Sequence, residues 1–189
     1  MRGHKQERIL RVLLADKEAS SKSEIARKAQ CTRPWVILFL RKLEKMKLVK
    51  GTRVLDAKKL IKYWQGVHKK PDNYRSYMIK EPLKLLRGTR LEYALTTYQA
   101  ENIVQHHLFP SRIDVYINEE DLSKWHELMT KNGLYGKGNV RVMITDNHVM
   151  YKKRKLEGLY AVCLPQLIID LSAEGGVCEE AAQLLMNGL

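Results

Sequence analysis

In the first third of the chain, apolar residues recur at intervals of three and four, with charged residues between them. That spacing is typical of amphipathic helices, and it predicts three of them, over about 5–16, 22–30 and 33–46. Ser21 and Glu24 have the spacing of a capping box at the start of the second helix. Thr32 can cap the third helix, and Pro34 suits its first turn, where a missing N–H costs nothing. The second and third helices therefore carry their own start signals.

The period changes after the third helix. Residues 48–55 form short β-type runs around Gly51, which is the pattern of a hairpin, and Asp56 can cap a further helix over 57–64. Residues 66–73 are rich in breakers and charge, so they are the best linker candidate. Helix, short helix, helix and basic hairpin is the order of the winged helix-turn-helix superfamily, which this part of the chain resembles. Two domains are expected, over 1–70 and 71–189.

The second part of the chain alternates between helical and strand patterns. Helices are expected over 82–90, 98–107, 119–132, 165–171 and 179–186. Strands are expected over 93–97, 112–117 and 139–144, with a weaker one over 149–151. The basic run 152–155 is interpreted as a solvated loop, with a second nucleic-acid contact as the alternative. These elements predict an α+β domain on a small sheet, so the expected fold class of the chain is α+β.

Charge is distributed unevenly between the two halves. Residues 1–90 carry 25 Lys and Arg against 8 Asp and Glu, whereas residues 91–189 carry 9 against 13. Such segregation favours a module that binds a polyanion at the N-terminus. An anionic membrane surface could also attract these charges, but no apolar stretch is long enough to span a bilayer and no signal peptide is recognisable. The protein is expected to be cytoplasmic, without a membrane partner.

The winged-helix resemblance implies that the third helix enters the major groove, while the hairpin and the second helix contact phosphates. It rests on Ser23-Glu24-Ile25-Ala26 and on the later positions Val36, Leu40, Leu43, Glu44, Leu48 and Val49. The candidates for the groove face are Arg33, Trp35, Arg41 and Lys42, and Thr32 is a further candidate for contact with DNA. The candidates for backbone contacts are Lys22, Arg27, Lys28, Lys50, Thr52 and Arg53. Backbone contacts give affinity but no sequence information.

The third helix departs from the usual pattern at Ile37, Leu38 and Phe39, where such helices usually carry polar residues. The exposed face is therefore expected to be partly apolar. Contact with thymine methyl groups is one use for such a surface. A protein partner, or a seam between two copies of the chain, is the commoner reason for exposed apolar side chains.

The order of segments in the second part resembles the C-terminal domain of the AbiEi family, the antitoxin and autorepressor of type IV abortive-infection toxin–antitoxin pairs. The residues that carry this resemblance are Tyr93-Ala94-Leu95-Thr96 with Ala100, Val115-Tyr116-Ile117, Gly138-Asn139-Val140, Asp146, Leu164 to Leu171 and Glu180-Ala181-Ala182. The resemblance implies DNA binding by the first domain and a regulatory role for the second. Its candidate partners are duplex DNA, a cognate toxin and a second copy of the chain on DNA.

A nucleotidyltransferase is the rival interpretation. Those enzymes place two carboxylates at alternate positions of a strand, because two metal ions on one face need alternate side chains. Here Leu95-Thr96-Thr97 and the strand with Asp114 occupy similar places, but the second carboxylate position holds Tyr116. The glycine that approaches a phosphate is also absent. The sequence therefore resembles such a scaffold without its catalytic pair.

No other constellation indicates catalysis, a metal or a cofactor. The three cysteines lie far apart and are expected to be reduced core residues, and His106-His107 is the only histidine cluster. The expected function is a sequence-specific DNA-binding transcriptional regulator, an autorepressor and antitoxin, and not an enzyme. The alternatives are a nucleotidyltransferase-like enzyme and an architectural DNA-binding protein with a sensory C-terminal domain.

Overall fold

The computed structural model describes residues 2–16 and 20–189 of the chain. The first part consists of α1 (Arg2–Ala15), α2 (Lys22–Lys28), α3 (Arg33–Lys45), the hairpin strands β1 (Val49–Lys50) and β2 (Arg53–Val54), and α4 (Ala57–Val67). The helices and the hairpin expected from the hydrophobic spacing are all present. α1 begins three residues earlier than expected, and α4 extends three residues further.

The apolar stripe of α4 packs against α1. Leu60, Ile61 and Trp64 are fully buried, as are Ile9 and Leu10 on α1. Burial of such a side chain stabilises a fold by about 1.5–3 kcal/mol relative to exposure. Two stripes of this size are enough to hold the two helices together, so α4 belongs to the core of the first part.

The second part contains all strands of the larger sheet. Its elements are β3 (Tyr74–Ile79), α5 (Pro82–Gly88), β4 (Tyr93–Thr96), α6 (Thr97–Gln105), β5 (Ile113–Ile117), α7 (Leu122–Asn132), β6 (Gly133–Tyr135), β7 (Val140–Ile144), β8 (Arg154–Leu156), β9 (Leu159–Ala161), α8 (Leu164–Glu174) and α9 (Val177–Asn187). Short 3-10 helices cover Glu119–Asp121 and Asn147–Met150. The fold is mixed α+β.

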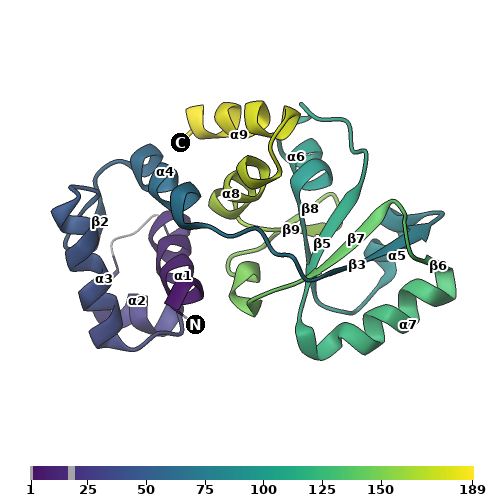
Figure 1. Cartoon of the computed structure of the whole chain (residues 1–189), viewed down its shortest axis with the longest axis horizontal. Helices are drawn as coiled ribbons and strands as arrows, with labels where there is room; N and C mark the ends of the chain where they lie inside the picture. Colours follow the sequence, from purple (N-terminus) through teal and green to yellow (C-terminus); the bar gives the residue numbers. More distant parts are fainter. Residues whose placement is uncertain (1, 17–19) are drawn as a thin grey trace.

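The strands form one seven-stranded mixed sheet in the order β6-β3-β7-β5-β4-β9-β8. β5 is parallel to β7 and β4 is parallel to β9, while the remaining pairs are antiparallel. Helices α6, α8 and α9 lie on one side of the sheet and α7 on the other (Figure 1). Because side chains alternate along a strand, Asp114 and Tyr116 of β5 face α8, whereas Val115 faces α7.

The expectation of a small sheet was wrong, because four strands had no clear sequence signal. β6, β8 and β9 have three residues each, and β3, which lies next to the edge strand β6, mixes polar with apolar residues. Long-range pairing stabilises such segments, and a local pattern does not report it. The basic run also differs from the expected loop, since Arg154 and Lys155 belong to β8, which pairs only with β9.

The strand expected over 149–151 is wrong as well. Asp146 accepts a hydrogen bond from the backbone N–H of His148, and a 3-10 turn follows. Val149 and Met150 are buried by this turn rather than by a strand. The cysteines carry no disulfide; Cys163 and Cys178 are buried as expected, but Cys31 is only half-buried.

Residues 68–73 connect α4 to β3 without regular secondary structure. The two parts also meet directly, because α8 contacts both α1 and α4. Figure 1 shows α8 beside α4, between the N-terminal helices and the sheet. Within 2–16 and 20–189, no helix combines the length and apolarity needed to cross a membrane.

Candidate nucleic-acid interface

The turn between α2 and α3 is built by local signals. The hydroxyl of Ser21 accepts a 3.1 Å hydrogen bond from the N–H of Glu24, which satisfies one free donor at the start of α2. Gln30 takes a positive φ of 51° in the turn, and Thr32 is the N-cap of α3 without a side-chain bond. Thr32 is exposed at the N-terminal end of α3, and its hydroxyl makes no cap hydrogen bond to that helix.

The two faces of α3 differ in character. Val36, Leu40 and Leu43 are buried, as the spacing predicted. Phe39 is buried too, at 3% exposure, and its ring lies 6.4 Å from that of Tyr63 on α4. The expectation of an exposed Phe39 was therefore wrong, because α4 covers that side of the helix. Leu38 is exposed and Ile37 is half-buried, so the exposed apolar surface of α3 is smaller than expected.

The outer face of α3 carries cations beside Leu38. Arg33, Arg41 and Lys42 are exposed, and the ammonium of Lys42 lies 5.5 Å from the centre of the Tyr63 ring. Trp35 is half-buried, with the Lys5 ammonium 5.9 Å from its ring centre. Cations over aromatic rings are attracted by the negative ring face. Trp35 is thus partly packed, while the arginines point into solvent.

The hairpin is tied to α3 by one side chain. Gly51 begins its turn with a positive φ of 63°, a conformation that favours glycine. Its N–H donates a 2.6 Å hydrogen bond to the carboxylate of Glu44 on α3. Lys50 and Arg53 are exposed on either side of the turn, and Thr52 is half-buried. The hairpin cations are therefore held at a fixed place beside α3.

Most of the expected contact residues have no acidic partner. Within the described part of the chain, no carboxylate lies within 4.0 Å of the following side chains: Lys22, Arg27, Arg33, Arg41, Lys42, Lys50 and Arg53. Lys28 differs, because its ammonium lies 2.7 Å from both Asp16 and Glu24. These bonds, that to Asp16 first, raise the pKa of Lys28 well above its usual value. Lys28 therefore contributes to the internal structure of the N-terminal part.

Sequence reasoning missed three lysines on α4. Lys58, Lys59 and Lys62 are exposed on the side opposite the buried stripe, and residues 57–67 contain no acid. Of the three, only Lys59 has a carboxylate from the described residues within 4.0 Å of its ammonium, that of Asp56 at 3.5 Å. The signal was present in the sequence as a lysine pair four residues apart. The apolar stripe by itself accounts for the helix, so the lysine pair led to no separate prediction.

The side of α1 and α2 away from the hairpin is occupied by the second part of the chain. Arg8 donates two 2.6 Å hydrogen bonds to Asp146. Arg11, at 3% exposure, donates to Gln166 on α8 and to Nδ1 of His148, both at 2.8 Å. Nε2 of His148 then donates to the backbone carbonyl of Lys28, at the end of α2.

These bonds fix the protonation state of His148. Its Nδ1 can accept from a guanidinium only as the neutral ring with the proton on Nε2. Burial, together with the cation of Arg11, lowers the pKa of His148 to about 4. The second part of the chain therefore holds α2 in place through a neutral histidine.

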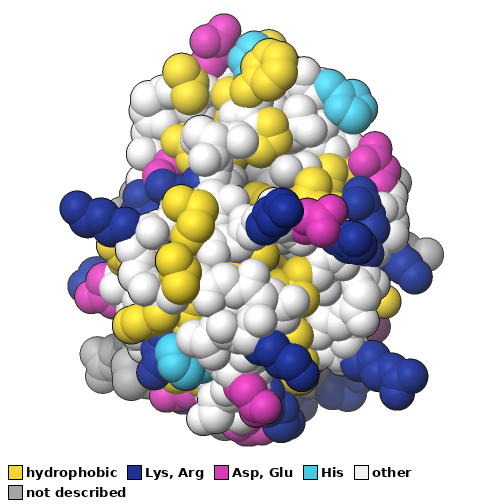
Figure 2. All heavy atoms as spheres, turned by 90° about the vertical axis from the view of Figure 1, so that its right-hand side faces the viewer, with side chains coloured by type: hydrophobic (Ala, Val, Ile, Leu, Met, Phe, Trp, Pro, Cys, Tyr) yellow, Lys and Arg dark blue, Asp and Glu magenta, His cyan; other side chains and the backbone are white. Residues whose placement is uncertain are grey.

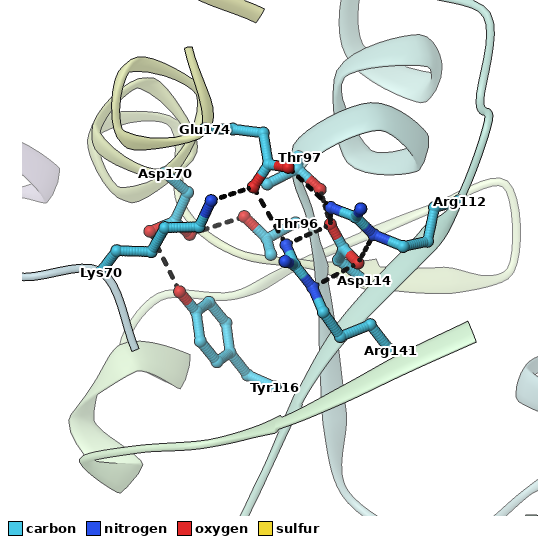
Figure 3. Close-up of polar contacts among 9 residues, drawn as sticks. All are labelled: Lys70, Thr96, Thr97, Arg112, Asp114, Tyr116, Arg141, Asp170 and Glu174. Atoms are coloured by element: carbon cyan, nitrogen blue, oxygen red, sulfur yellow. Dashed lines mark hydrogen bonds and ion pairs between the residues drawn. The ribbon is translucent and has the colours of Figure 1, made fainter. Parts of the chain in front are cut away.

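A second polar cluster surrounds Asp114, the carboxylate that the nucleotidyltransferase interpretation of the sequence singled out (Figure 3). Asp114 is completely buried, and both of its oxygens accept from Arg112 and Arg141, over 2.6–2.9 Å. The hydroxyl of Thr97 also donates to Asp114. Because five donors occupy the two oxygens, no lone pair remains for a metal ion without loss of these bonds.

Glu174 closes the same cluster from the end of α8. It accepts from both arginines and lies 2.7 Å from the ammonium of Lys70, in the connecting segment. Burial by itself raises the pKa of Glu174, but the bonds from Lys70, Arg112 and Arg141 lower it to about 2. The arrangement is a set of compensated charges that attaches the connecting segment to the sheet.

Tyr116, two positions after Asp114 on β5, belongs to a separate network. Its hydroxyl donates to Asp170 at 3.1 Å, and Thr96 donates to the other oxygen of Asp170 at 2.6 Å. Burial raises the pKa of both Asp170 and Tyr116. Over 2–16 and 20–189, no three His, Cys, Asp or Glu side chains gather as a metal site would require.

Comparison with known proteins adds no assignment: no family model matches the chain, and no curated protein or solved structure is significantly similar to it.

Proposed function

We propose that the N-terminal part is a winged helix-turn-helix that binds duplex DNA through α3 and the β1–β2 hairpin. One observation carries this proposal. Arg33 and Arg41 on α3, and Lys50 and Arg53 on the hairpin, are exposed with no carboxylate partner in the described chain, and Glu44 joins the two elements. A row of unpaired cations on a rigid frame suits phosphates and base edges.

The position of the second part supports the assignment of DNA binding to α3 and the hairpin. It packs against α1 and the end of α2, through Arg8, Arg11 and the Lys28 carbonyl. In Figure 1 the hairpin lies at the left-hand end of the molecule, away from the sheet. DNA could therefore reach α3 and the hairpin without displacing the second part.

We further propose that the protein is a transcriptional regulator that represses its own operon, with the second part in an antitoxin-like role. The resemblance to the AbiEi family supports this role, and the unequal distribution of charge agrees with it. An architectural DNA-binding protein with a sensory second domain is the remaining alternative. A toxin gene beside this one, and footprinting on the upstream DNA of that operon, would separate the two.

We also propose that the protein is not a nucleotidyltransferase. The support is chemical: Asp114 is neutralised by two guanidinium groups, and Tyr116 is a poor ligand for a hard cation. Incubation with labelled nucleoside triphosphates and Mg²⁺ or Mn²⁺ should transfer no label to protein or RNA. Transfer that disappears in Asp114→Ala would reverse this assignment, whereas transfer that survives the substitution indicates a contaminant.

The test of DNA binding is the salt dependence of the full-length protein on a fluorescent 20-base-pair duplex. Each phosphate contact releases about one counterion, so the slope of log affinity against log salt falls by about one unit for each contact removed. We expect Lys50→Ala and Arg53→Ala to reduce the slope and Lys84→Ala, on α5, to leave it unchanged. Equal slopes in all four proteins would contradict the assignment of the surface.

A further inference from the structure

The end of the molecule farthest from the hairpin carries an open edge of the sheet. β6 is the outermost strand of the sheet, and β3 is its only partner strand among residues 2–16 and 20–189. It lies at the right-hand end of the molecule in Figure 1, beside the end of α7. An unpaired strand offers free N–H and C=O groups to another chain, so this edge is a place where a partner can add.

The register shows which backbone groups are free. The N–H of Gly136 donates to the carbonyl of Ser76, and Tyr135 lies opposite Tyr77. Because bonded pairs alternate along an antiparallel ladder, Leu134 and Gly136 direct their backbone groups to β3. Gly133 and Tyr135 direct theirs away from the sheet, toward any strand that approaches.

The side chains at this edge are apolar and exposed. Leu134 is 74% exposed and lies opposite Met78, which is 49% exposed. Tyr135 is 61% exposed on the other face, where its ring lies 5.3 Å from that of His126. Each face of β6 therefore offers apolar surface to the alternate side chains of an added strand.

A groove of about 530 Å³ continues from this edge between α5 and α7. It is lined by Ile79, Lys80, Glu81, Lys84, Leu85, Gly88, Thr89, Leu128, Lys131 and Asn132. Three of these residues are exposed lysines, and the single acid, Glu81, lies 3.3 Å from Lys84. The groove meets β6 at Gly133, which follows Asn132 in the chain and lies opposite Ile79. The groove and the edge therefore form one basic and apolar surface.

The charges decide what this surface can accept. Lys131 and Lys137 flank β6 in sequence and are exposed, and Lys80 follows β3. A second copy paired through β6 would bring these lysines together, which opposes association. An acidic segment would neutralise them. Figure 2, which views this end, shows apolar side chains at the surface with lysine and arginine side chains around them.

We propose that β6 and the adjoining groove bind an acidic, extended segment of another protein, which adds to the sheet as an eighth strand. Main-chain hydrogen bonds to Gly133 and Tyr135 hold the segment. Apolar side chains of the segment pack on Leu134 and Met78, and its carboxylates face Lys84 and Lys131. The surface lies at the opposite end of the molecule from the hairpin (Figure 1), so this binding does not depend on the proposed DNA contact.

The probe is a fluorescent ten-residue peptide of alternating Glu and Val, measured by anisotropy on the full-length protein. Its counterpart of alternating Lys and Val is the control for composition. We expect the acidic peptide to bind and the basic one not to bind. Lys84→Glu with Lys131→Glu should weaken the acidic peptide at least tenfold. The matched pair Lys58→Glu with Lys62→Glu, on α4, should change its affinity less than twofold.

The backbone contact has its own test. Tyr135→Pro removes the outward N–H without breaking the ladder to β3, and Tyr135→Ala removes only the side chain. We expect the proline variant to bind the peptide at least fivefold more weakly than the alanine variant. Hydrogen exchange of residues 133–137 should slow when the peptide binds.

Three results would overturn the proposal. They are no binding of the acidic peptide at millimolar concentration, equal losses in the α4 and groove pairs, and equal affinity of the two Tyr135 variants. Equal losses of peptide affinity in the two pairs would show unspecific attraction to a basic protein. Equal peptide affinity of Tyr135→Pro and Tyr135→Ala would show that the peptide docks without adding a strand. None of these results bears on whether α3 and the hairpin bind DNA.

Discussion

The carboxylate of Glu44 in α3 accepts a 2.6 Å hydrogen bond from the backbone N–H of Gly51, at the turn between β1 and β2. Glu44 is also the only acidic residue between Arg33 and Val54. An acid on a surface that we assign to DNA opposes phosphate binding, so its position needs a structural reason. The bond supplies one, since it sets the place of the hairpin relative to α3.

We predict that Glu44→Ala frees the hairpin turn, whereas Glu44→Gln keeps it in place. An exposed hydrogen bond of this kind contributes about 1 kcal/mol, so amide exchange at Gly51 should become about fivefold faster in the alanine variant. The glutamine variant retains an acceptor and should exchange nearly as the original protein does. Hydrogen exchange followed by NMR measures both, and a fast Gly51 in Glu44→Gln would assign the effect to charge instead.

The residues assigned to the DNA major groove and those assigned to phosphates are predicted to affect DNA sequence specificity differently. Lys50→Ala and Arg53→Ala should weaken binding to all duplexes by a similar factor, because phosphates carry no sequence information. Arg33→Ala should change which duplex is preferred, by about 1–3 kcal/mol at the base pair it contacts. A panel of duplexes titrated at one salt concentration distinguishes the two effects. If all three variants lost affinity by a similar factor on every duplex, Arg33 would not be a residue that reads bases in the major groove.

Arg11 is predicted to hold the two parts of the chain together. Arg11→Met leaves Oε1 of Gln166 and Nδ1 of His148 buried without their donor. Loss of charge-assisted bonds in the interior should lower the free energy of unfolding by about 3 kcal/mol. Chemical denaturation measures the loss, with Arg41→Met on the exposed face of α3 as the matched control, expected within 0.5 kcal/mol of the original protein. A similar small change in Arg11→Met would show that the contact is dispensable.

His148 predicts a dependence of stability on pH. Its pKa in the folded protein is about 4, below the ordinary value of 6.5, so the unfolded chain binds the proton more readily. Its contribution is therefore complete above pH 6.5 and is lost as the pH falls toward 4. Relative to His148→Gln, the original protein should lose about 2–3 kcal/mol over that interval. Unfolding curves of both proteins between pH 7.5 and 4 measure this loss, and parallel profiles would exclude His148 as its source.

Much of the fold could be predicted from local patterns. The helices of the N-terminal part have apolar stripes of their own. Three of them also have start signals in the sequence: the N-caps Ser21 and Asp56, and Pro34 in the first turn of α3. β4, β5 and β7 were recognisable because most of their residues are apolar, β-branched or aromatic. Helices and buried strands of this kind leave a signal, since the period of burial follows the period of the backbone.

The strands β3, β6, β8 and β9 could not be predicted in the same way. β3 and β6 exist because they pair with each other, and Asn139, sixty residues from Ile79 in sequence, bonds the backbone of Ile79 through its amide. Gly133 permits this pairing, because a Cβ there would lie 2.1 Å from the carbonyl oxygen of Met78. Such contacts come from distant parts of the chain and have no local period.

The candidate sites also have features that local sequence predicts and features that depend on contacts between distant segments. The sequence by itself determined which segment carries the excess of cations and that Tyr116, and not a carboxylate, stands two positions after Asp114. Only the tertiary structure decided that Lys28 is paired, that Phe39 is buried, and that Arg112 and Arg141 both bind Asp114. The physical reason is that the charge and periodicity of a segment are local properties. The partner of a buried charge is chosen by packing between segments that the sequence keeps far apart.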